Sequence, residues 1–156
     1  MKIGVPKEIK PQENRIGLTP DSVKTLVSEG HEVLIENNGG FEAGFDNDHY
    51  KNAGAKIIEK AADIFNDAEI IVKVKEPQKV EVEMIRENQI VYTYLHLAAA
   101  KELTEGLVKS KSINIAYETI TDDNGRLPLL APMSAVAGRM SVQAGAHCLE
   151  KNQKGR

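Results

Sequence analysis

The sequence has little that would place the protein outside the cell or in a membrane. It contains a single cysteine, Cys148, which excludes an intrachain disulfide framework and favours a reducing compartment. No apolar run approaches the ~20 residues that a membrane-spanning helix needs. The N-terminus, MKIGVPKEIK, lacks the apolar segment of a signal peptide. These absences predict a cytoplasmic protein without membrane contact.

An excess of charge of either sign is also missing. The 20 Lys and Arg residues against 23 Asp and Glu residues give a net charge of -3. Nucleic-acid-binding proteins usually carry a basic stripe, and proteins that bind anionic membranes carry polybasic runs, neither of which occurs here. We therefore expect a small-molecule ligand and predict no nucleic-acid or membrane partner.

The patterns that mark common cofactor and metal sites are absent. No two glycines are separated by one residue, so the G-x-G-x-x-G turn that binds dinucleotides cannot occur. The G-x-x-x-x-G-K-[ST] phosphate loop and the G-x-S-x-G elbow are missing too. The histidines are too dispersed in the sequence to suggest a metal site, and none is predicted. A domain without these patterns suits a substrate-binding role, with any cofactor held by a partner domain.

What the sequence does contain is a regular alternation of strand and helix patterns. Apolar, β-branched runs predict strands at 2–5, 31–36, 56–58, 69–74, 89–95 and 113–117. Helices are predicted between them and after them, at 20–29, 48–53, 61–68, 80–87, 101–111 and 133–150. This alternation predicts an α/β fold, with a doubly wound, mostly parallel sheet and helices on both faces.

Residues capable of chemistry lie after three of the predicted strands. Lys75 ends the run IIVKVK, His96 ends IVYTYLH, and Arg15 lies in the loop after the first strand. Ligands of open parallel sheets bind outside the carboxyl ends of the strands, so these residues should share one edge. Two cations could hold a carboxylate and a carbonyl oxygen, and histidine could move a proton near neutral pH. A small keto or amino acid would suit this set.

Each of these residues also has an ordinary structural explanation. A loop arginine or a lysine at a strand end is commonly solvated, and the histidine could be a satisfied structural residue. Lys73, two residues before Lys75, has a similar local context, and the alternation in VKVKEP would put both lysines on the same face. The residues alone therefore leave the choice between the two lysines open.

The last predicted helix, MSAVAGRMSVQAGAHCLE, is rich in small residues, which allow another backbone to approach closely. It suits a crossing between two domains or an interface, or alternatively a core helix packed on its own sheet. We predict a substrate-binding domain over residues 1–132 and a linking helix over 133–156 that leads to an absent cofactor-binding domain. Because the chain stops soon after this helix, we expect it to be truncated.

Six stretches together resemble the N-terminal part of alanine dehydrogenase, a family of NAD-dependent enzymes. They are MKIGVPKEIK, ENRIGLTP, KVKEP, YLHLA, AYET and LLAPMSAVAGRMS, and with their spacing they extend over nearly the whole chain. The resemblance implies that Arg15 and Lys75 bind substrate, that Lys75 and His96 are catalytic with His96 as the acid/base, and that Ser134 contacts the nicotinamide. It also favours Lys75 over Lys73. The related transhydrogenase α subunit lacks this lysine and this histidine.

The chain departs from that family in its length, because the family's glycine-rich NAD domain and a further catalytic aspartate are absent. The resemblance implies the reaction of L-alanine, NAD and water to pyruvate, ammonia and NADH in the full-length enzyme. We expect this chain to be inactive alone, to bind NAD weakly at most, and to retain part of the contact surface of the family's homohexamer. The alternatives are a non-catalytic module that binds keto or amino acids and an assembly fragment.

Overall fold

The structure is a computed structural model that describes residues 1–155. The chain divides into two compact units, Met1–Ala116 and a second unit that begins at Tyr117. The first unit contains the sheet, and the second contains the long C-terminal helix.

A parallel sheet organises the first unit. Within residues 1–155 the sheet has six strands in the order β3-β2-β1-β4-β5-β6, and every adjacent pair is parallel. The strands are β1 (Lys2–Val5), β2 (Glu32–Glu36), β3 (Lys56–Ile58), β4 (Ile70–Val72), β5 (Ile90–Thr93) and β6 (Ile113–Ala116). The chain winds outward from β1 through β2 to β3, then returns to β4 beside β1 and winds the other way. The predicted doubly wound α/β fold is confirmed.

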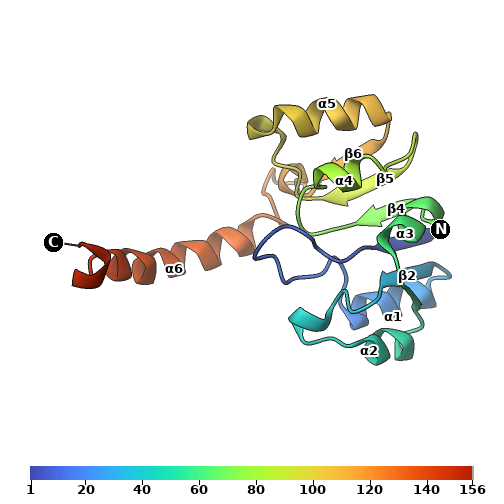
Figure 1. Cartoon of the computed structure of the whole chain (residues 1–156), viewed down its shortest axis with the longest axis horizontal. Helices are drawn as coiled ribbons and strands as arrows, with labels where there is room; N and C mark the ends of the chain where they lie inside the picture. The colour runs from blue at the N-terminus through green and yellow to red at the C-terminus, as the bar shows by residue number, and fades with distance from the viewer. Residues whose placement is uncertain (156) are drawn as a thin grey trace. The chain divides into compact units, whose positions relative to one another are not determined.

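Helices connect successive strands, as parallel pairing requires. They are α1 (Pro20–Ser28), α2 (Asn47–Asn52), α3 (Ala61–Asp67), α4 (Lys79–Val82) and α5 (Lys101–Ser110), with short 3-10 turns η1 (Phe41–Ala43) and η2 (Leu97–Ala99). Figure 1 shows α1 and α2 beside β2, and α4 and α5 on the side of β5 and β6. Thr19 caps α1 through its side chain and Pro20 begins the helix, as the sequence predicts.

The alternation of side chains along the strands separates two apolar cores, one on each face of the sheet. In β2, Val33 and Ile35 join the core that contains Tyr50 of α2, whereas Leu34 between them joins the core that contains Phe65 of α3. All of these side chains are buried. Helices therefore cover both faces, and the central strands are apolar in both directions, as a buried parallel sheet demands.

Three predicted elements are clearly shorter than expected, and one of them is the strand predicted at 89–95, which is β5 (Ile90–Thr93). The strand predicted at 69–74 ends at Val72, because the amide of Val74 donates to the Glu8 carboxylate instead of to a neighbouring strand. The helix predicted at 80–87 is α4, a single turn that ends at Val82. Its next amides bond three residues back, from Met84 to Glu81 and from Ile85 to Val82, which tightens the chain into turns.

Tyr50 gives the first core a spectroscopic marker. Its side chain is fully buried, its hydroxyl donates to the Leu18 carbonyl at 3.0 Å, and burial raises its pKa to about 12. Because the folded pKa lies above that of the unfolded phenol, this group's contribution to stability is lost as the pH rises from about 10 to about 12.

We expect ultraviolet titration at alkaline pH to show one tyrosine that ionises near pH 12, or only when the protein unfolds, and Tyr50→Phe to remove that component. A Tyr50→Phe protein that keeps the late phase would contradict the assignment. Tyr92→Phe, at a half-buried position of β5, is the matched control and should leave the Tyr50 component in place.

The second unit contains the turn η3 (Tyr117–Thr119), the long helix α6 (Ala131–Cys148) and the turn η4 (Lys151–Gln153). The helix predicted at 133–150 is thus present with both ends shifted by two residues. None of its residues is buried, and Val136, Met140 and Val142 are more than half exposed. The described residues therefore offer no support for a core helix. In the part of the chain that the structure describes, no helix combines the length and the apolar character needed to cross a membrane.

Candidate functional site

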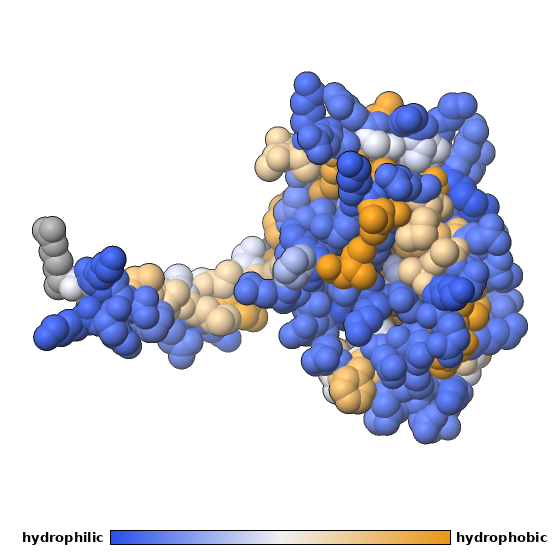
Figure 2. Space-filling view, viewed as in Figure 1, coloured by the Kyte–Doolittle hydropathy of each residue, from blue (hydrophilic) through white to orange (hydrophobic). Residues whose placement is uncertain are grey.

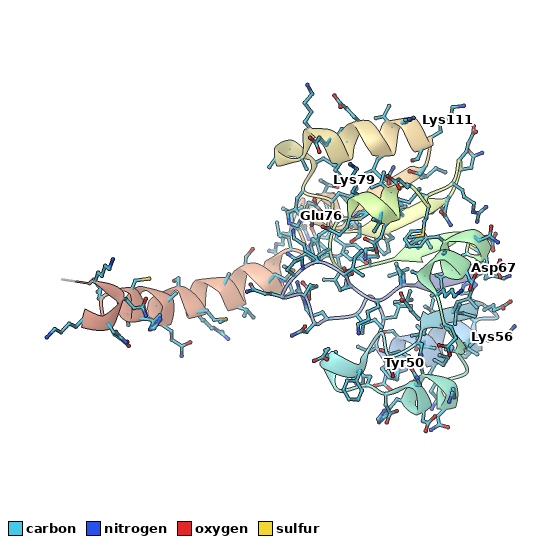
Figure 3. All side chains as sticks on the ribbon, in the orientation of Figure 1. Tyr50, Lys56, Asp67, Glu76, Lys79 and Lys111 are labelled. Carbon is cyan, nitrogen blue, oxygen red and sulfur yellow. The ribbon has the colours of Figure 1, made fainter. Side chains whose placement is uncertain are left out.

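The candidate site lies where the winding direction of the sheet reverses. β1 and β4 are neighbours at this switch point, and their carboxyl ends lead into the loops at 6–19 and 73–78. The loop after β5, at 94–100, continues from the adjacent strand. Open α/β sheets bind ligands in the crevice that such diverging loops leave. Figure 3 shows Glu76 at this edge of the sheet.

A buried ionic triad lies next to the carboxyl ends of β1 and β4. The Lys73 ammonium lies 3.0 Å from the carboxylate of Glu8 and 2.8 Å from that of Glu81. The Lys73 side chain is 0% exposed and both carboxylates are 2% exposed. Burial raises the pKa of Glu81, and the facing Lys73 opposes that shift. The triad joins the β1 loop, the β4 loop and α4, so Lys73 is occupied as a structural cation.

Glu8 also fixes the backbone that carries Lys75. One oxygen of its carboxylate accepts the amide of Val74 at 2.6 Å and that of Lys75 at 3.2 Å. From the other side, the Thr93 hydroxyl of β5 donates to the Lys75 carbonyl at 2.8 Å. The Lys75 main chain is therefore held from the loop after β1 and from β5, whereas its side chain remains partly exposed. The two lysines, which have a similar local context in VKVKEP, therefore differ in burial: Lys73 is buried and Lys75 is partly exposed.

Arg15 is oriented by a carboxylate from its own loop. Its guanidinium donates two bonds to Glu13, from Nε at 2.8 Å and from Nη2 at 2.6 Å. The side-chain hydrogen bond from Arg15 is the largest factor that holds the pKa of Glu13 at about 2, and the positive charge of Lys75 contributes to it. Glu13 is only 7% exposed, but the Arg15 side chain is 48% exposed. A buried carboxylate thus anchors an outward-facing arginine near Lys75.

Gly17 brings the loop of Arg15 against the end of β4. A Cβ atom at this glycine would lie 2.6 Å from the Val72 carbonyl oxygen and 2.9 Å from its carbon. Both are backbone atoms of a buried strand, which cannot give way as a flexible side chain does. The close approach therefore sets the distance between the loop that holds Arg15 and the segment that holds Lys75.

His96 has the left-handed backbone conformation, with φ 51° and ψ 36°. Its side chain is half exposed, and its Nδ1 lies 3.4 Å from Oε2 of Glu76. The other oxygen of Glu76 accepts a short hydrogen bond from Lys10. The ring of Tyr94 lies 6.2 Å from the imidazole between centroids. A non-glycine residue in this conformation requires support from its surroundings, and such positions are common in functional sites.

The structure therefore brings Arg15, Lys75 and His96 to the same edge of the sheet, on the loops after β1, β4 and β5. Ser134 lies in the second unit, in the first turn of α6, where its hydroxyl donates to the Leu130 carbonyl at 3.3 Å. Among residues 1–155, no three His, Cys, Asp or Glu side chains gather as metal ligands.

The loop after β1 lacks the turn that binds the pyrophosphate of a dinucleotide cofactor. In dinucleotide-binding sheets, a glycine-rich turn after the first strand lets the pyrophosphate approach a helix N-terminus. Here the loop after β1 contains no closely spaced glycines.

A groove of about 690 Å³ lies between α4 and α5, next to Glu76. Its apolar surface comes from Val82, Ile85 and Leu103. The backbone at Gly106 lies close to Val82, since a Cβ at this glycine would be 2.8 Å from the Val82 side chain. Figure 2 shows hydrophobic atoms gathered in the region of α4 on a surface that is otherwise mostly hydrophilic.

The anionic residues of the site are the part that sequence reasoning missed. Three carboxylates contact the cationic residues: Glu13 binds the Arg15 guanidinium, Glu8 binds the Lys75 amide, and Glu76 lies beside His96. All three lie in stretches rich in Pro, Lys and Glu, a composition that predicts solvated loops. Only the position of Lys73, directly after a continuous β-branched run, signals that a buried charge needs carboxylate partners.

The sequence matches the family described as alanine dehydrogenase/PNT, N-terminal domain, over residues 4–137. The chain belongs to this family. It is 54% identical to an alanine dehydrogenase of Halomonas elongata over 99% of its length, and 51% identical to that of Geobacillus stearothermophilus over 100%. It covers 42% of each of these relatives, so the chain spans less than half of their length.

Solved structures give the same result. An L-alanine dehydrogenase superposes on 100% of this alanine dehydrogenase-type domain, with a TM-score of 0.91 and 53% identity, and the domain covers 43% of that chain. A transhydrogenase from Sinorhizobium meliloti matches 77% of the domain, with a TM-score of 0.72 and 27% identity. The greater likeness to the dehydrogenase agrees with the resemblance that the sequence motifs indicate.

Proposed function

We propose that the chain is the substrate-binding part of an NAD-dependent alanine dehydrogenase and that its site takes pyruvate or L-alanine. One observation carries this proposal: three loops at the switch point bring a guanidinium, an ammonium and an imidazole to one edge of the sheet. A small 2-oxo acid offers a carboxylate and a carbonyl, and an amino acid offers an amine in place of the carbonyl. These groups match the three side chains.

Arg15 would bind the substrate carboxylate, because a guanidinium offers paired donors to two oxygens and Glu13 fixes its orientation. Lys75 would bind the carboxylate and carbonyl oxygens of the substrate, and its positive charge would stabilise the negative charge on these oxygens. His96 would transfer the proton at the carbonyl oxygen or amino group, which an imidazole can do near neutral pH. The buried pairing of Lys73 with Glu8 and Glu81 supports Lys75 as the lysine of this set.

The full reaction would convert L-alanine, NAD and water to pyruvate, ammonia and NADH. The nicotinamide, when bound, accepts the hydride from the substrate carbon, and it must be held against that carbon. Ser134 would contact it, as proposed from the family motif. Because the described residues provide no dinucleotide turn, we expect this chain to bind NADH weakly at most and not to turn over alanine by itself.

Isothermal titration with pyruvate tests the proposal directly. We expect the 156-residue chain to bind pyruvate, and Arg15→Ala or Lys75→Ala to weaken binding by roughly 10–100-fold, the effect of losing a charge-assisted hydrogen bond. Lys79→Ala, which removes an exposed lysine four residues from Lys75, is the matched control and should change nothing.

Pyruvate binding that survives both substitutions would place the ligand elsewhere and refute the proposed site. No binding by the unaltered chain would favour an assembly fragment. Pyruvate binding to this chain, together with failure to turn over pyruvate, ammonia and NADH when the remaining part of a full-length relative is supplied, would favour a non-catalytic binding module.

The remaining expectations belong to the same proposal. The division into a substrate-binding domain at 1–132 and a linking helix at 133–156 stays a prediction, as does assembly into the homohexamer of the family. The exposed apolar residues of α6 would suit such an interface. A cytoplasmic location rests on the single cysteine, which is exposed.

A further inference from the structure

We propose that Glu76 is the positioning residue of His96: it holds the imidazole with Nδ1 protonated, so that Nε2 is the nitrogen that exchanges a proton with substrate. This inference deepens the proposed function, on which the role of Nε2 rests. The tautomer itself is a property of the chain without ligand and can be measured independently.

The geometry of Glu76 supplies the first argument. Its Oε2 is buried and has no hydrogen-bond partner, and Nδ1 of His96 lies 3.4 Å away. A buried carboxylate oxygen without a donor is costly, and a small rotation of the half-exposed imidazole would bring an Nδ1–H group to it. Contacts of this kind are often long in unliganded sites and tighten when substrate binds.

Lys10 supplies the second argument, because it fixes the other half of the carboxylate. Its ammonium donates to Oε1 of Glu76, which leaves Oε2 directed at His96. Burial would raise the pKa of Glu76, but the hydrogen bond from Lys10 and the charges of Lys10 and His96 outweigh it, so the pKa is lowered. Glu76 is therefore an anion at neutral pH and can only accept a hydrogen bond.

The chemistry depends on how a neutral imidazole carries its proton. One ring nitrogen donates and the other accepts, and the hydrogen bond that one nitrogen makes decides the role of the other. A carboxylate at Nδ1 selects the Nδ1–H form and leaves Nε2 as the acceptor. Metal-binding and triad histidines are fixed by carboxylates in the same way.

His147 provides an internal comparison. Its Nδ1 is also 3.4 Å from a carboxylate, that of Glu150, but both side chains are more than half exposed. Water competes for an exposed carboxylate, whereas the Oε2 of Glu76 has no access to it. We therefore expect His96 to be held in the Nδ1–H form and His147 to show the Nε2–H form that an unconstrained histidine prefers.

The test is a long-range proton–nitrogen correlation spectrum of the ligand-free, ¹⁵N-labelled chain at a pH where the imidazoles are neutral. The His96 signals are assigned by their loss in His96→Gln. In Glu76→Gln, the Lys10 ammonium should donate its hydrogen bond to the oxygen of the new side-chain amide. The NH₂ group of that amide would then face Nδ1 of His96. We expect this substitution to convert His96 to the Nε2–H form, and Lys10→Met, which keeps the carboxylate, to retain Nδ1–H.

The control variant Glu150→Gln should leave His96 unchanged. A His96 that is mainly Nε2–H in the unaltered chain, or that keeps its tautomer in Glu76→Gln, would overturn the inference. If Glu76→Gln does not fold, the unaltered chain and Lys10→Met decide the matter by themselves. A tautomer reversal in a chain that does not bind pyruvate would retain the Glu76–His96 pairing and refute only the proposed function.

Discussion

Lys73→Met should destabilise the domain by about 3–5 kcal/mol at neutral pH, the cost of removing one partner from a buried ion pair. The substitution leaves the carboxylates of Glu8 and Glu81 buried, each 2% exposed, without a cation. Chemical denaturation followed by circular dichroism measures the loss. The matched control is Lys75→Met, the same change at a partly exposed position, which should alter the free energy of unfolding by about 0.5 kcal/mol or less.

The pH dependence of this loss has a definite sign. Burial raises the pKa of Glu81 even with Lys73 present, and removal of Lys73 deletes the opposing charge. A carboxyl with a raised folded pKa contributes stability below its unfolded pKa, and this contribution disappears as the pH rises through the folded pKa. The deficit of Lys73→Met relative to the unaltered chain should therefore shrink as the pH falls from 7 toward about 4.5. Equal losses for the two lysine variants would contradict the structural role of Lys73.

Gly17→Ala should both destabilise the domain, by about 1–3 kcal/mol, and impair pyruvate binding. The added Cβ would lie 2.6 Å from the Val72 carbonyl oxygen, so either the loop or the end of β4 must move. Such a shift separates Arg15 from Lys75, and a substrate as small as pyruvate cannot bridge a widened gap. Denaturation and isothermal titration on the same preparation measure the two effects.

Gly138→Ala is the matched control for this change. A Cβ at Gly138, within α6, meets no heavy atom within 4 Å, and alanine favours helix by about 1 kcal/mol over glycine. We expect this variant to bind pyruvate as the unaltered chain does. A Gly17→Ala protein with normal stability and normal affinity would show that the close approach does not set the geometry of the site.

The fold was largely predictable because its signals are local. Alternating apolar runs and caps such as Thr19-Pro20 specify each strand and helix, and parallel pairing is a consequence of their order. The early end of β4 has a different cause. β4 ends where the amide of Val74 donates to the Glu8 carboxylate, a contact between residues 66 positions apart that no local pattern reveals.

The positions of the three cationic residues of the candidate site were predictable from the sequence, whereas the positions of the carboxylates beside them were not. Arg15, Lys75 and His96 lie after strands, and a parallel sheet brings the loops at the carboxyl ends of its strands to one edge. The choice between Lys73 and Lys75 required the family motif, because period-two alternation assigns both to one face. In the structure the chain leaves the strand at Val72, and Glu8 decides which lysine is buried.

The all-parallel sheet has a consequence for how the protein folds. β1, at the centre, pairs with β4, and the contact from Lys2 to Glu69 spans 67 positions of the chain. Closing such long loops costs chain entropy before any pairing is gained, so folding of parallel sheets is slow. During synthesis, the first strand must wait for β4 to leave the ribosome before the switch point can form. The site therefore assembles late, only after all three loops that build it are available.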